Sequence, residues 1–65
     1  MNTLTELYSY CRDMAAEYPD ATEDLMMLYS LAEMEVDDGC SEAHEVELAH
    51  FDIKDLIQVY KANTK

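Results

Sequence analysis

Apolar residues recur at three- and four-residue steps along most of the chain, a spacing typical of amphipathic helices. The first stripe consists of Leu4, Leu7, Tyr8, Cys11, Met14, Ala15 and Tyr18. It predicts a helix over residues 4–18. Thr3 and Glu6 form a capping box at its start, in which each side chain accepts from the other residue's backbone N–H. Pro19 ends the helix, because proline has no N–H and restricts the residue before it.

The second segment predicts a helix over residues 21–38 that is apolar on two sides. One face consists of Leu25, Leu28, Tyr29, Ala32 and Val36, and the other of Met27, Leu31 and Met34. The run from Asp20 to Glu23 offers a second box-like start, and Gly39 suits the left-handed position after the last turn. Because two sides are apolar, we expect this helix to be central and to contact other elements on both.

The third segment predicts a helix over residues 42–62, with Ser41 as its N-cap. Its stripe consists of Val46, Ala49, Ile53, Leu56, Ile57 and Tyr60. The pair Phe51-Asp52 offers an alternative restart, with Asp52 as a new cap. The stripe runs through this pair without a break, so the pattern favours one continuous helix.

No segment shows the alternation of a strand, and the connections are short enough to make consecutive helices antiparallel neighbours. The sequence therefore predicts a single all-α domain over residues 1–65, a small bundle of three helices. A chain of 65 residues buries only roughly 60% of its unfolded surface, which is near the limit for independent folding. We expect homo-oligomerisation to complete the bundle.

Several apolar side chains lie outside the best stripes. They are Tyr10, Met26, Leu48, Phe51 and Val59. A bundle of this size has little room to cover them together with the second face of the central helix, and uncovered apolar surface marks interfaces. The predicted self-association face consists of Met27, Leu31, Met34, Leu48 and Phe51.

Acidic residues outnumber basic ones by 15 to four, which gives a net charge of −11. This charge argues against direct binding to nucleic acid or to anionic membranes and favours a basic protein as the partner. A run of acids lies where the helix macrodipole disfavours negative charge, at the end of the second helix. The candidate acidic docking surface consists of Glu33, Glu35, Asp37, Asp38, Glu42 and Glu45. The alternative is that these charges serve only solubility.

The sequence offers no recognisable metal or catalytic site. His44 and His50 are six residues apart, or about 120° around a helix, and no four-ligand zinc pattern accompanies them. An alignment of Gly39 with the glycine of a calcium-binding EF-hand loop puts Met34 and Val36 at ligand positions. Phosphate loops and nucleophile elbows are lacking. We expect no enzyme activity, no cofactor and no metal.

The two cysteines, Cys11 and Cys40, are too few for a disulfide scaffold and are expected to be free thiols in a reducing cytosol. Cys11 lies on the first stripe, where a small buried residue fits. No apolar run reaches the length of a membrane span, and no signal peptide is recognised. A cytoplasmic location follows as the expectation.

In its size, its capped start at Met1-Asn2-Thr3 and its many acids with one Gly and one Pro, the chain resembles the small acidic helical accessory proteins of temperate bacteriophage early regions. That resemblance implies binding to a host protein in the bacterial cytosol. The leading hypothesis is a small acidic protein-interaction module. One alternative is a nucleic-acid mimic that occupies the basic site of a DNA- or RNA-binding protein. Another is a small metal-binding or structural subunit.

Overall fold

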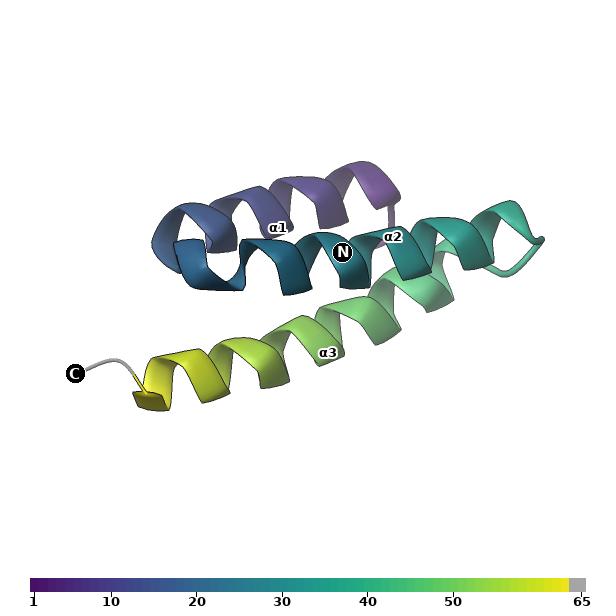
Figure 1. The fold of residues 1–65 in the computed structure, drawn as a ribbon. Coiled ribbons are helices and arrows are strands. Elements are labelled where there is room, and N and C mark those ends of the chain that lie inside the picture. The colour runs from purple at the N-terminus through teal and green to yellow at the C-terminus, as the bar shows by residue number, and fades with distance from the viewer. Residues whose placement is uncertain (64–65) are drawn as a thin grey trace.

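The computed structural model describes residues 1–63, which form three α-helices and contain no strand (Figure 1). The helices are α1 (Leu4–Glu17), α2 (Thr22–Asp37) and α3 (Glu42–Asn63), with a 3₁₀ turn, η1 (Pro19–Ala21), between the first two. The prediction of a small all-α bundle of three helices is confirmed. Each helix boundary lies within one residue of the expected position.

Each helix packs against the other two, in an elongated bundle of about 41 × 17 × 16 Å. Consecutive helices run antiparallel, as Figure 1 shows. The helix α2 contacts both α1 and α3. Its second apolar face, Met27, Leu31 and Met34, stays exposed, so the bundle does not supply the contact expected on that side. Direct contact between α1 and α3 closes the third side of the bundle and leaves one face of the α2–α3 pair away from α1.

The start of α1 carries the predicted capping box. The Glu6 N–H donates to the Thr3 hydroxyl oxygen at 3.2 Å, and the Glu6 carboxylate accepts from the N–H groups of Asn2 at 2.9 Å and Thr3 at 3.1 Å. These bonds, that from Asn2 first, lower the pKa of Glu6. A further bond joins distant parts of the chain, because the Leu4 N–H donates to Glu42 Oε2 at 2.8 Å.

The corner between α1 and α2 differs from the prediction in one respect. Tyr18 caps α1, with its N–H donating to the Met14 carbonyl at 2.7 Å, and Pro19 then opens η1. The predicted box-like start of α2 is wrong, because its N-cap is Ala21 and no side chain caps it. Because η1 already sets Thr22 in the helical region, the Thr22 hydroxyl is free to donate backwards to the Pro19 carbonyl at 2.7 Å.

The end of α2 forms a Schellman motif around Gly39. The Gly39 N–H donates to the Val36 carbonyl, and the Cys40 N–H donates to the Glu35 carbonyl, each at 3.0 Å. Gly39 has a φ of 102°, in the region that side chains rarely adopt. The predicted left-handed residue after the second helix is confirmed, and this turn sets how α3 returns along α2.

The helix α3 begins at the predicted cap and continues without a break. The Ser41 hydroxyl accepts from the His44 N–H at 3.4 Å, and the Ser41 carbonyl accepts from the Glu45 N–H at 3.0 Å. The helix passes through Phe51 and Asp52, so the single-helix prediction is confirmed over the alternative of a restart.

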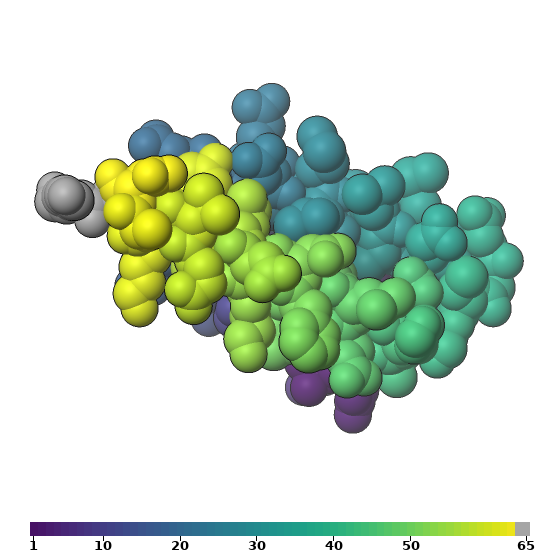
Figure 2. Space-filling model, turned by 90° about the horizontal axis from the view of Figure 1, so that it is seen from below, coloured from purple at the N-terminus to yellow at the C-terminus, as the bar shows by residue number. Residues whose placement is uncertain are grey.

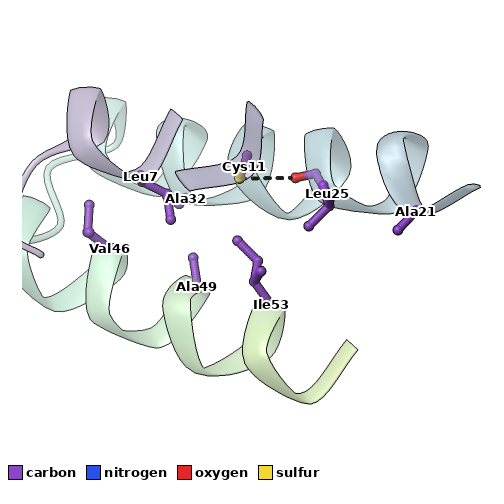
Figure 3. Close-up of a cluster of buried hydrophobic side chains, with 8 residues drawn as sticks. All are labelled: Leu7, Cys11, Ala21, Leu25, Ala32, Val46, Ala49 and Ile53. Atoms are coloured by element: carbon purple, nitrogen blue, oxygen red, sulfur yellow. Dashed lines mark hydrogen bonds between the residues drawn. The ribbon is translucent and has the colours of Figure 1, made fainter. Parts of the chain in front are cut away.

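The core is apolar and small (Figure 3). Its buried side chains are Leu7, Cys11, Ala21, Leu25, Ala32, Val46, Ala49 and Ile53. Three of these are alanines, which let the helices approach closely but fill little volume. One stripe residue, Tyr8, is 42% exposed, with its ring edge-on to Tyr29 at 5.3 Å between centroids. The core is therefore narrower than the stripes suggest.

Candidate protein-binding groove

Exposed apolar side chains gather on α2 and α3. Apart from Met1 and Tyr8, the large apolar residues that the structure leaves exposed all belong to these two helices, and they are Met27, Leu31, Met34, Leu48, Phe51 and Val59. The structure thus places every residue of the predicted self-association face in contact with solvent.

Helix geometry explains why the bundle leaves them uncovered. At 100° per residue, Leu31 lies about 120° from the buried Leu25, and Leu48 lies about 100° from the buried Ala49. Each leucine therefore lies on the flank of its helix, between the buried side and the solvent-facing side. Their exposed fractions are 52% for Leu31 and 47% for Leu48.

Three further apolar side chains extend these flanks outward. Met27 and Met34 are four residues before and three residues after Leu31, which places all three on neighbouring turns of one side of α2. Phe51 stands in the same relation to Leu48 on α3 and is 61% exposed. The two flanks together form an apolar border on both sides of the line where α2 and α3 meet.

A groove of about 150 Å³ lies on this line. Figure 2 shows the outer side of α3, green to yellow, with α2 in teal alongside it. The residues that line the groove all come from α2 and α3: Leu28, Leu31, Ala32, Glu35, Glu45, Leu48, Ala49 and Asp52. Two of these lining residues, Ala32 and Ala49, have small side chains and are nearly buried, with exposed fractions of 4% and 6%.

The polar part of the groove is entirely acidic. Its lining contains the carboxylates of Glu35, Glu45 and Asp52 and neither Lys nor Arg. The Glu35 carboxylate also accepts from the Cys40 thiol at 3.6 Å. Desolvation, followed by this carboxylate, raises the pKa of Cys40. Glu35 and Glu45 belong to the predicted docking surface, whereas Asp52 does not.

The other four acids of the predicted docking surface lie outside the groove. Glu33 accepts from the Tyr29 hydroxyl at 3.4 Å, and Glu42 accepts from the first N–H of α1. Asp37 and Asp38 are exposed where α2 ends. The structure therefore divides the predicted acidic surface and brings only two of its members beside the exposed leucines.

No protein-family model matches the chain, and neither a curated protein nor a solved structure is significantly similar to it. The resemblance to bacteriophage accessory proteins stays a prediction. Within residues 1–63, no helix is both long enough and apolar enough to cross a lipid bilayer.

His50 and Cys11 both pack against neighbouring helices. The His50 ring lies edge-on to Tyr10, with 4.9 Å between centroids, at a contact between α3 and α1. The buried Cys11 thiol faces the Leu25 carbonyl at 3.8 Å, and burial raises its pKa to about 11 (Figure 3). Its thiol is thus protonated at neutral pH and is a poor nucleophile. Among the described residues, no three potential metal ligands form a group.

The sequence predicts an acidic surface and a separate apolar surface, whereas the groove contains residues of both. The spacing within each helix does indicate that these residues lie together. Leu31 and Glu35 are four residues apart on α2, and Leu48 is four residues before Asp52 on α3. Pairing each of these two leucines with the acid one turn later identifies one leucine and one acid on each side of the groove. The alignment of the two halves depends on helix packing, which the pattern does not contain.

Proposed function

We propose that this chain is a small protein-interaction module and that its docking face is the α2–α3 groove with the apolar border around it. The observation that carries the proposal is the pair Leu31 and Leu48, half-exposed on the two sides of one hollow. A large aliphatic side chain gains roughly 1.5–3 kcal/mol when it is fully buried, so two half-buried leucines retain a substantial gain for a partner to complete.

The shape of the groove supports this use. A hollow of about 150 Å³ is comparable to a cavity that accepts a benzene ring, so the groove has room for one large side chain of a partner. Protein interfaces are commonly organised around such an anchor in a pocket, with less critical contacts around it. Met27, Met34 and Phe51 would supply those surrounding contacts, and methionine adapts well to different partner shapes.

Self-association through this face, expected from the sequence, stays a prediction that sedimentation tests directly. The nucleic-acid mimic has less support, because the predicted acids lie on different parts of the bundle and three of them, Glu33, Glu35 and Glu42, accept hydrogen bonds. A cytosolic location fits the free thiols of Cys11 and Cys40.

The test compares affinity capture from source-cell lysate by the wild-type chain, by the double variant Leu31→Ser/Leu48→Ser, and by Val59→Ser. Val59 is a matched control, because it is exposed and apolar but does not line the groove. We expect at least one protein to be recovered with the wild type and the control but lost with the double variant, and to bind the purified chain in a titration. Circular dichroism establishes that all three chains are folded.

Equal recovery of every captured protein by the double variant and the control, together with a monomeric wild type in sedimentation, would contradict the proposal. A wild-type dimer that the double variant dissociates would support the docking face and identify its occupant as a second copy.

A further inference from the structure

Building on the proposed function, we infer that the groove accepts a basic amphipathic helix of another protein, with one large apolar side chain in the hollow and Lys or Arg residues beside Glu35, Glu45 and Asp52. The shape and the charge of the groove both favour such a helix, and the charge disfavours the competing occupants.

The shape favours a helix. The lining residues span Leu28–Glu35 on α2 and Glu45–Asp52 on α3, and each stretch is two helical turns, or about 12 Å, long. Two antiparallel helices leave a shallow channel between them, into which the ridge of a third helix packs. Helices recognised in this way present apolar residues at i, i+3, i+4 and i+7 along one side. An i to i+7 stripe covers two helical turns, which is the length of the groove.

The charge selects a basic helix. Three carboxylates line the hollow without a Lys or Arg, in a chain with a net charge of −11. Lys and Arg residues on both sides of the partner's apolar stripe would face these carboxylates, with their aliphatic stems lying on the border residues. Such pairs at the rim of an interface speed association and set specificity more than they add affinity.

The same charge disfavours a second copy of this chain. A two-fold dimer pairs the same surface patch from both subunits, so Glu35, Glu45 and Asp52 of one copy would meet those of the other. Like charges placed together across an interface are costly. With four basic residues against 15 acidic ones, the chain has few cations to offset that repulsion. An acidic or neutral helix would fill the hollow without compensating its rim.

The experiment uses three synthetic peptides of about 16 residues, a length at which an isolated helix is marginal in water. The first has an apolar helical stripe flanked by Lys and Arg. The second keeps the stripe but has Glu in place of the basic residues. The third has the composition of the first in an order that destroys the stripe. Fluorescence anisotropy measures binding at low and high salt, and circular dichroism measures the helix gained on binding.

We expect the basic amphipathic peptide to bind and to become helical, and we expect its affinity to fall as salt is raised. The acidic peptide and the scrambled basic peptide should each bind at least about tenfold more weakly, because each lacks one of the two features that the groove recognises.

Two charge variants of the full chain sharpen the test. One neutralises the three groove carboxylates: Glu35→Gln, Glu45→Gln and Asp52→Asn. The other neutralises three exposed acids that do not line the groove: Asp13→Asn, Glu17→Gln and Glu47→Gln. Both remove the same net charge, so long-range attraction falls equally. The groove variant should bind the basic peptide about tenfold more weakly than the control variant, as expected for three rim pairs of about 0.5 kcal/mol each.

Equal binding of the basic and scrambled peptides, or equal losses in the two charge variants, would overturn the inference, because attraction would then depend on net charge alone. A wild-type dimer that Leu31→Ser/Leu48→Ser dissociates, with no peptide bound, would overturn it while the docking face stands. Failure of every peptide to bind and of groove-dependent capture, with a monomeric wild type in sedimentation, would overturn both the inference and the proposed function.

Discussion

Two leucines of the same helix offer a direct measure of how open the proposed docking face is. Leu25 and Leu31 both lie in α2, and the same substitution by alanine removes the same atoms from each. Leu25 is 0% exposed and Leu31 is 52% exposed. Alanine is also the best helix former, so neither change weakens the helix itself. The difference between the two variants therefore reports burial alone.

The magnitudes follow from that difference. Removing a fully buried leucine side chain to alanine costs about 2–5 kcal/mol, because it combines the lost transfer free energy with the cavity left behind. At Leu31 about half of the side chain already faces water, so the transfer loss is about 1 kcal/mol. No enclosed cavity forms there, because the groove opens to solvent. We expect Leu31→Ala to cost at least twofold less than Leu25→Ala.

Urea denaturation followed by circular dichroism gives both free energies, and it should be repeated at two protein concentrations tenfold apart. For an open face, the midpoints of the wild type and of Leu31→Ala are independent of concentration. The reasoning fails if Leu31→Ala costs as much as Leu25→Ala and the wild-type midpoint rises with concentration. That combination would mean that a second copy buries Leu31, and it would overturn the basic-helix inference as well.

Three further predictions concern the helix ends. Glu42→Ala removes the acceptor of the Leu4 N–H and should lower the free energy of unfolding by about 1 kcal/mol in urea denaturation, whereas no loss would mean that water replaces the bond at no cost. Gly39→Ala should lower the free energy of unfolding by about 1–2 kcal/mol in the same assay, because a φ of 102° is unfavourable for any residue with a side chain. Nothing lies within 4 Å of the added carbon, so the cost comes from the backbone alone, and an unchanged midpoint would refute it. The native pKa of Glu6 lies below the ordinary 4.5, so the carboxylate stabilises the fold fully above pH 4.5 and ceases to do so as the pH falls through the native value. Glu6→Gln should therefore reduce the loss of unfolding free energy on acidification. An identical pH dependence in the wild type and the variant would contradict this role of Glu6.

The helix boundaries were predictable because their signals are local. The capping box at Thr3, the proline at position 19, the glycine at position 39 and the cap at Ser41 each act within one turn, and each lies where the sequence placed it. The 3₁₀ turn was missed, because a turn of three residues has no periodicity of its own. Its presence turned Ala21 into a buried N-cap and left Thr22 inside the helix.

The site was predictable only in part. That the off-stripe leucines stay exposed follows from the spacing within each helix. That Leu31 and Leu48 flank the same hollow depends on how far α3 is shifted along α2, which packing decides and no local signal states. The role of Glu42 was out of reach for the same reason, since the N–H that it accepts belongs to a residue 38 positions earlier.

The small, alanine-rich core bears on how fast the protein is degraded in a cell. Within residues 1–63, a core of eight buried side chains, three of them alanine, leaves a small free-energy margin between the native chain and its opened forms. A partner present at 100 times its dissociation constant adds about 2.7 kcal/mol to that margin, which makes the open chain about 100-fold rarer. Because proteases act on the open chain, we expect copies not bound to the proposed partner to be degraded first and the abundance of the protein to follow that of the partner.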